Sequence, residues 1–251
     1  EKRPFVRHDV TDLSKNQKII ENSVSMVSRE DAPIALESAD QQTVPDELEF
    51  IVKNAGASVL IYGNDFADKV SELHCRGSNA TDIRAWIEVG GPEQLNRFAE
   101  PYVELLATGD PELSHVGARD EDNLFIMYTS GTTGLPKGSV HSHGSFFWSV
   151  LTMAATADVR FKDRYAVVLP MFHVGALLPV VVNIYLGATV IMLRAFDPKT
   201  MWEIVEGERV TTTLAVPSML NFMLLVPRFE TYDQSSLRWI LAGATPVPVT
   251  L

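Results

Sequence analysis

The stretch YTSGTTGLPKGSVHSH, residues 128–143, concentrates glycine and hydroxyl side chains around one lysine. Its three glycines, Gly131, Gly134 and Gly138, can adopt positive φ angles and let a ligand approach the backbone. Free backbone N–H groups in such a loop form a cradle for an anion, and Lys137 adds a mobile positive charge. Further donors come from four hydroxyl groups: Thr129, Ser130, Thr132 and Thr133. A triphosphate requires this combination, so the stretch predicts a phosphate-binding loop.

Strands and helices alternate on both sides of this loop. An apolar run over residues 123–129 predicts a strand, and residues 144–157 predict a helix. Further strands are predicted over residues 165–170, 188–194, 211–217 and 237–244, and further helices over residues 174–187, 198–208 and 218–227. This alternation indicates an α/β fold with layered, mostly parallel sheets flanked by helices. The loop then lies between a strand and a helix, at the carboxyl end of the strand, where open α/β sheets bind ligands.

The first part of the chain is less regular. Residues 1–43 are polar and only weakly periodic, so we predict a divergent or poorly ordered segment there. Order begins at about residue 44, with a helix that Thr43 caps and Gly56 ends, a strand over 58–63 and a short helix over 67–73. A mixed region of turn and acidic residues then leads to the strand at residue 123. We therefore expect one folded region, residues 44–251.

The composition argues against some classes of protein. The formal net charge of −11 is unsuited to a general nucleic-acid-binding protein. The single cysteine, Cys75, cannot form an internal disulfide, and the first ten residues lack the apolar core of a signal peptide, which together suggest the cytoplasm. Residues 165–193 contain no Asp, Glu, Lys or Arg, but prolines and glycines interrupt them. We predict strand, helix, turn and strand of a soluble core there, and no transmembrane segment.

The loop differs from that of the common nucleoside triphosphatases, because Pro136 precedes Lys137 and Gly138 follows it. Instead, YTSGTTGLPKG resembles the signature of the acyl-adenylate-forming (AMP-binding) superfamily, which includes acyl-CoA synthetases, luciferases and the adenylation domains of peptide synthetases. Three later motifs resemble the same family: LPMFHVGAL at residues 169–177, AVPSML at 215–220 and LAGATPVP at 241–248. The resemblance covers residues 44–251 and implies the fold of the family's large N-terminal domain, incomplete in this chain.

The resemblance implies a role for each motif. The loop would hold the β- and γ-phosphates of ATP, and its first threonine would also help to hold Mg²⁺. The phosphate-binding residues are then Thr129, Ser130, Gly131, Thr132, Thr133, Gly134 and Lys137. The acyl-pocket residues are Phe172, His173, Val174, Pro217 and Ser218, and the adenine residues are Gly243, Ala244, Thr245 and Pro246. His173 is the candidate for a catalytic role, although a lone histidine outside such a motif is more often structural.

The reaction that the resemblance implies has two steps. A carboxylate attacks the α-phosphorus of Mg-ATP to give an acyl-adenylate and pyrophosphate, and the thiol of coenzyme A then displaces AMP. Residues 170–183 contain no acidic side chain that could meet the ammonium group of an amino acid. The apolar helices after His173 and Pro217 suit an aliphatic chain. We therefore favour a medium- or long-chain fatty acid, with an aryl carboxylate as the alternative.

Some parts of the family pattern are missing from the sequence. The later blocks that supply a Mg²⁺-binding Glu and a ribose-binding Asp do not occur, and neither does the C-terminal domain with the catalytic lysine. We therefore expect the chain to be part of a longer acyl-CoA synthetase, and the alternative is a catalytically inactive fragment with residual nucleotide binding. His141 stands at an apolar position of the family, and with His143 it makes only a weak metal pair, because no third ligand is near.

Overall fold

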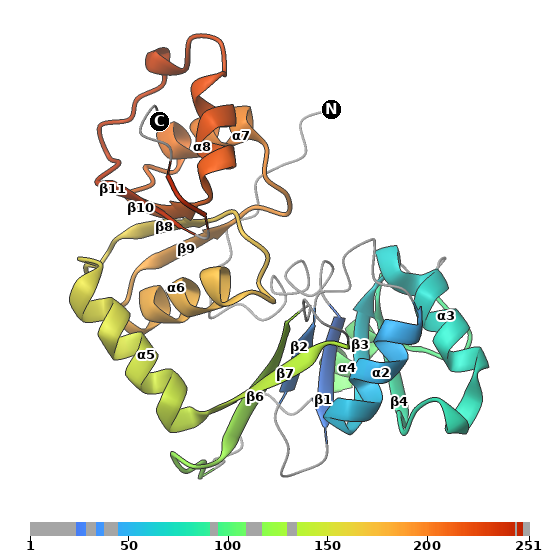
Figure 1. Ribbon diagram of the computed structural model, residues 1–251. Coiled ribbons are helices and arrows are strands. Elements are labelled where there is room, and N and C mark those ends of the chain that lie inside the picture. Colours follow the sequence, from blue (N-terminus) through green and yellow to red (C-terminus); the bar gives the residue numbers. More distant parts are fainter. Residues whose placement is uncertain are drawn as a thin grey trace. The chain divides into compact units, whose positions relative to one another are not determined.

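The computed structural model describes residues 24–28, 34–37, 45–90, 95–108, 117–129, 135–243 and 245–247, the first two ranges as backbone only. The described residues form two compact units, which divide between Phe147 and Trp148. Each unit contains one β-sheet with helices packed against it (Figure 1).

The first unit contains a seven-stranded sheet in the order β5-β4-β3-β1-β2-β6-β7. Its strands are β1 (Val24–Ser28), β2 (Ile34–Glu37), β3 (Ala57–Gly63), β4 (Ala85–Val89), β5 (Glu100–Pro101), β6 (Asn123–Thr129) and β7 (Lys137–Ser142). Neighbouring strands run parallel except for three antiparallel pairs, which are β1 with β2, β1 with β3 and β6 with β7. The helices of this unit are α2 (Pro45–Ala55), α3 (Ala67–Cys75) and α4 (Tyr102–Thr108).

The apolar spacing of α2 explains how it packs. Leu48, Ile51 and Val52 fall on one face of the helix and are buried in the same cluster as Leu60 of β3. Gly56 follows the helix with a φ angle of 64°, a conformation that glycine adopts at little cost. The chain can therefore turn directly from α2 into β3, as the sequence predicted.

The second unit contains a four-stranded, wholly parallel sheet in the order β11-β10-β8-β9. Its strands are β8 (Arg164–Val167), β9 (Thr189–Met192), β10 (Thr212–Ala215) and β11 (Trp239–Ala242). Helix α6 (Val174–Tyr185) covers one face of the sheet, and α7 (Pro198–Gly207) and α8 (Pro217–Leu224) cover the other (Figure 1). Helix α5 (His143–Thr156) belongs to the first unit at its start and to the second from Trp148 onward.

One buried carboxylate joins the starts of three neighbouring strands. Asp163 precedes β8, Thr211 precedes β10 and Arg238 precedes β11. Arg238 Nη1 donates to both oxygens of the Asp163 carboxylate, at 2.6 Å each, and Thr211 Oγ1 donates to its Oδ1 at 2.8 Å. The Arg164 amide donates to Thr211 Oγ1 at 2.9 Å, and the Arg238 amide donates to the Thr211 carbonyl at 2.7 Å. These hydrogen bonds hold β8, β10 and β11 in register at their amino ends.

The helices and strands predicted from residue 44 onward are found, with ends that differ by a few residues. The sequence predicted no element within residues 1–43, but β1 and β2 lie there, and it also missed β4, β5, α4 and β7. Most of the missed strands are short and pair with distant parts of the chain, so local periodicity does not signal them. Residues 165–193 contain β8, α6 and β9, as predicted. No helix in the described ranges is both long and apolar enough to cross a membrane.

The Asp163 carboxylate predicts a pH-dependent part of the stability. Burial raises its pKa, but the hydrogen bonds from Arg238, from the Arg160 amide and from Thr211 outweigh burial and hold the pKa below its ordinary value. The resulting stabilisation is present above the ordinary aspartate pKa of about 4 and is lost as the pH falls below it. We expect Asp163→Asn to lower the free energy of unfolding by about 3 kcal/mol at neutral pH. Urea unfolding should show this gap at neutral pH and a smaller gap in acid.

Asp158→Asn is the matched control. Asp158 lies 2.6 Å from Arg238 Nη2, but its side chain is 59% exposed, so we expect a much smaller loss of stability. Equal losses from the two variants, or an Asp163→Asn gap that does not change with pH, would contradict the role given to Asp163.

Candidate active site

The predicted phosphate-binding loop is the turn of a β-hairpin. β6 ends at Thr129 and β7 begins at Lys137, and these two residues are cross-strand partners. Thr129 Oγ1 donates to the Lys137 carbonyl at 3.4 Å, and both residues are exposed. The loop follows the carboxyl end of β6, as predicted, but the prediction that it leads directly into a helix is wrong, because β7 comes before α5. The predicted residues Ser130, Gly131, Thr132, Thr133 and Gly134 lie outside the described residues.

Gly138 has a different role from the predicted one. Its φ angle lies outside the positive region that a glycine can adopt. A Cβ atom at Gly138 would instead lie 2.7 Å from Ile126 Cγ2 and 3.2 Å from Tyr128 Cζ, both on the opposite strand. Tyr128 OH donates to Asn54 Oδ1 of α2 at 2.6 Å. The glycine therefore provides the space in which β6 side chains cross over β7, and Tyr128 ties the hairpin to α2.

His141 is explained by an aromatic contact on the other face of the hairpin. Its ring stacks on its cross-strand partner Phe125, with centroids 4.8 Å apart and an angle of 26° between the rings. Phe125 also meets Phe146 of α5 edge-on at 5.0 Å. His143 begins α5, and its amide donates to the Asp122 carbonyl. In the part of the chain that the structure describes, no three His, Cys, Asp or Glu side chains are grouped so that they could hold a metal ion.

The predicted acyl and adenine residues follow the carboxyl ends of three neighbouring strands in the second unit. Phe172 and His173 come after β8. Pro217 and Ser218 come after β10, and Gly243 comes after β11. Because β11, β10 and β8 are parallel neighbours, their carboxyl ends meet at one edge of the sheet. The fold thus brings three segments that are far apart in the sequence to the edge at which open α/β sheets bind ligands.

These segments differ in how exposed their residues are and in how closely a ligand could approach their backbone. A Cβ atom added at Gly243 would meet no atom within 4 Å, so a flat group can approach the backbone there. Thr245 and Pro246 are exposed, and Ala244 lies outside the described residues. Pro217 is buried as the first residue of α8, whereas Ser218 beside it is exposed.

His173 caps helix α6. Its Nδ1 accepts a hydrogen bond from the Gly175 amide at 3.1 Å, and the residue is exposed. Val174 is 41% exposed and Phe172 is partly buried beside it. The sequence predicted His173 for an acyl pocket but did not reveal this cap, because the usual residues at such a position are Ser, Thr, Asp and Asn.

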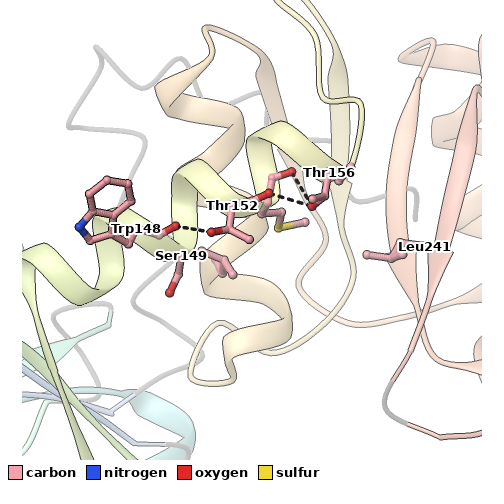
Figure 2. A pocket seen from close by; sticks show the side chains of 8 residues that line it. Trp148, Ser149, Thr152, Thr156 and Leu241 are labelled. Carbon is pink, nitrogen blue, oxygen red and sulfur yellow. Dashed lines mark hydrogen bonds between the residues drawn. The ribbon is translucent and has the colours of Figure 1, made fainter.

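An open apolar groove lies between α5, α6 and β11 of the second unit. Its volume is about 540 Å³, and it is lined by Trp148, Ser149, Thr152, Met153, Thr156, Ala157, Leu178 and Leu241. Figure 2 shows Leu241 projecting from its strand toward α5. Thr152 Oγ1 donates to the Trp148 carbonyl and Thr156 Oγ1 to the Thr152 carbonyl, at 2.8 Å each. Because their own helix satisfies both hydroxyls, the two threonines add mainly methyl surface to the groove.

Sequence reasoning missed this groove. The signal was the row of small residues at a spacing of three and four along α5, which places them on one face of that helix. Nothing in the local sequence indicated that Leu241 of a distant strand would face that row.

Comparison with known proteins identifies a family. A family model described as AMP-binding enzyme matches residues 34–251, so the match begins before the predicted boundary at residue 44. The long-chain-fatty-acid–CoA ligase FadD13 of Mycobacterium tuberculosis is 37% identical over 205 residues, which are 82% of this chain and 39% of the relative. The feruloyl-CoA synthase of an Amycolatopsis species is 36% identical over 211 residues, which are 82% of this chain and 38% of the relative.

A solved structure supports the same assignment. The inhibitor-bound N-terminal domain of FACL13 from Mycobacterium tuberculosis has a TM-score of 0.76 and 36% identity, and the match covers 84% of this chain and 50% of that chain. The chain spans about two fifths of the length of the curated relatives it matches. The expected α/β fold, with parallel sheets flanked by helices as in the N-terminal domain of acyl-adenylate-forming enzymes, is confirmed. The chain belongs to the AMP-binding enzyme family.

Proposed function

We propose that this chain is the acid- and nucleotide-binding part of an ATP-dependent acyl-CoA synthetase. The observation that carries the proposal is the shared edge at the carboxyl ends of β8, β10 and β11, because His173, Ser218 and Gly243 all follow strands that end there. Such an edge suits one extended ligand, with its acyl end near β8 and its aromatic ring near β11. An acyl-adenylate has this form.

In this proposal, two of the sequence motifs contribute to ATP binding. Lys137 offers a positive charge and Thr129 a hydroxyl group, both exposed at the base of the phosphate-binding loop. The turn from Gly243 to Pro246 lies beside the adenine, where the backbone is open. Thr129 Oγ1 is an oxygen ligand of the kind that Mg²⁺ prefers, and this metal, when bound, screens the charge of the phosphates.

In this reaction, these residues position the acid and ATP and stabilise charge on the phosphates, and they form no covalent bond to the substrate. A carboxylate oxygen forms a bond to the α-phosphorus of ATP as the bond to pyrophosphate breaks, and Lys137 stabilises charge on the departing phosphates. Coenzyme A is the second substrate, whose sulfur takes the acyl group as AMP leaves. The exposed free thiol of Cys75 suits a reducing compartment, and we place the protein in the cytoplasm.

The acid in this proposal is a medium- or long-chain fatty acid. The apolar groove between α5, α6 and β11 supports it, because its lining is largely apolar and the hydroxyls of Thr152 and Thr156 already donate within their own helix. The relative that acts as a long-chain-fatty-acid–CoA ligase supports the same class. An aryl carboxylate is the second candidate, supported by the relative named as a feruloyl-CoA synthase.

Exchange of label between pyrophosphate and ATP tests the first half-reaction. The assay uses medium-chain, long-chain and aryl acids in turn, with the 251-residue chain and with any longer product of the same gene. We expect aliphatic acids to support exchange in the longer product. Exchange with aryl acids alone would favour the second candidate. ATP binding without exchange in either form would contradict the synthetase proposal in favour of an inactive nucleotide-binding protein.

Lys137→Ala tests the phosphate-binding loop directly. A charge-assisted hydrogen bond contributes about 1.5–3 kcal/mol, so we expect the Kd for Mg-ATP to rise about tenfold to a hundredfold in calorimetric titration. Lys199→Ala is the control, because it removes an exposed lysine of α7 whose partner, Glu203, is 3.5 Å away on the same helix. A similar weakening in both variants would mean that net charge, and not the loop, governs ATP binding.

Leu241→Trp tests the groove as the site of the acyl chain. The larger ring fills space near α5 and displaces about two methylene groups of a long acid, each worth about 0.8 kcal/mol. We expect KM to rise about tenfold for long-chain acids and to stay unchanged for medium-chain acids. Leu225→Trp enlarges a residue that is 75% exposed and outside the groove, so it should change neither value. An equal effect on acids of every length would place the acyl chain elsewhere.

A further inference from the structure

His173 is an unusual cap for helix α6. An N-cap side chain accepts a hydrogen bond from the amide of the second or third helical residue, and short oxygen-bearing side chains do so most often. Here the imidazole Nδ1 accepts from the amide of Gly175, the second residue of the helix, at 3.1 Å. A histidine in this place therefore completes the cap and keeps a second ring nitrogen, Nε2, on an exposed residue.

The Gly175 amide determines where the ring hydrogen lies. A backbone N–H group can only donate, so Nδ1 must present its lone pair to that group. In a neutral imidazole the other nitrogen then carries the hydrogen. We infer that the Gly175 amide holds neutral His173 in the Nε2–H tautomer, so that the outer edge of the ring is a hydrogen-bond donor without a free lone pair.

The rest of His173 is held in place by its own backbone. Its amide donates to the Pro170 carbonyl at 3.1 Å, and its carbonyl accepts from the amides of Ala176 and Leu177 at 2.9 and 3.1 Å. Within the described ranges, the imidazole makes no hydrogen bond or ion pair apart from the one with Gly175. Nε2 is thus the atom of this side chain that can meet a ligand.

This inference rests on the proposed function and makes it more specific. The Nε2–H group of His173 donates to one oxygen of the substrate carboxylate, and after adenylation it donates to the carbonyl oxygen of the acyl-adenylate. The second carboxylate oxygen forms the bond to the α-phosphorus as pyrophosphate leaves, and no proton is transferred because the acid enters ionised. His173 is therefore a neutral donor that positions the acid, and it has no free lone pair with which to remove a proton from the thiol of coenzyme A.

Gly175 is the positioning residue in this arrangement, and it acts through its backbone. A Cβ atom there would lie 3.4 Å from His173 Nδ1 and 3.5 Å from Leu169 Cδ1, which are ordinary contact distances. The glycine is thus not required for space beside the ring. What the ring requires from residue 175 is its N–H group.

NMR spectroscopy of the protein labelled with ¹⁵N in its histidine rings tests the tautomer without any assay of activity. Long-range ¹H–¹⁵N correlations distinguish a ring nitrogen that carries a hydrogen from one that carries a lone pair, and His173→Asn assigns the signal by its disappearance. The spectra are recorded at about pH 8, well above the ordinary histidine pKa of about 6.5. We expect a single Nε2–H species. An Nδ1–H species, alone or as a visible fraction, would overturn the inference.

Two variants distinguish the two roles of His173, which are capping α6 through Nδ1 and donating to the substrate through Nε2. His173→Asn keeps a short acceptor for the Gly175 amide but does not reach the position of Nε2, whereas His173→Gln carries an NH₂ group near that position and is a poor cap. We expect Gln, but not Asn, to lower Tm by about 2–4 °C. In the exchange assay we expect Asn to raise KM for the acid about tenfold to a hundredfold and Gln to raise it less.

The outcomes distinguish this inference from the proposed function. A wild-type KM in His173→Asn would show that the cap alone matters and would overturn the inference. Exchange activity together with an Nδ1–H ring would overturn the inference and leave the synthetase proposal standing. An Nε2–H ring in a protein that activates no acid would support the tautomer and contradict the synthetase proposal.

Discussion

The candidate site depends on a carboxylate at the opposite end of the strands. Asp163 is only 4% exposed and accepts hydrogen bonds from Thr211 and from Arg238, which is 75 positions away in the sequence. These three residues immediately precede β8, β10 and β11, each of which has four residues. Because the strands are parallel and equal in length, a register held at their amino ends also determines which residues emerge at their carboxyl ends. His173, Ser218 and Gly243 reach one edge for this reason.

The hairpin of β6 and β7 is held by different interactions. Alternate residues of β6 point to opposite faces, so Phe125 stacks on His141 while Tyr128 reaches Asn54 of α2. Gly138 permits the second of these contacts, because any side chain there would collide with Ile126. The hairpin is thus tied to α2 through Tyr128 and to the start of α5 through Phe125.

The sequence predicted the fold well where local pattern and global structure agree. The apolar runs at β6, β8, β9 and β10 and the helical spacing of α2 and α7 sufficed, because each of these elements buries the face that its own residues define. β7 was missed because it is polar and largely exposed, so its conformation comes from pairing with β6 rather than from its composition. β1 and β2 were missed because they have only five and four residues, and they pair with β3 and β6, which lie later in the chain.

The candidate site was predictable in part. Motif resemblance singled out His173, Pro217 and Gly243, and the parallel sheet explains why such segments gather at one edge. The Asp163–Arg238 contact and the groove beside Leu241 were not predictable, because both join positions that no local pattern relates. The cap that His173 provides was missed for a different reason: histidine is not among the residues that usually cap a helix.

The most direct test of the shared edge is a crystal structure of the protein with a non-hydrolysable acyl-adenylate analogue, a fatty acyl sulfamoyl adenosine. We predict that the acyl carbonyl oxygen lies at about 2.7–3.2 Å from His173 Nε2, with the adenine beside the backbone of Gly243. An analogue bound away from the carboxyl ends of β8, β10 and β11 would contradict the account, as would one whose nearest contact with His173 is not Nε2.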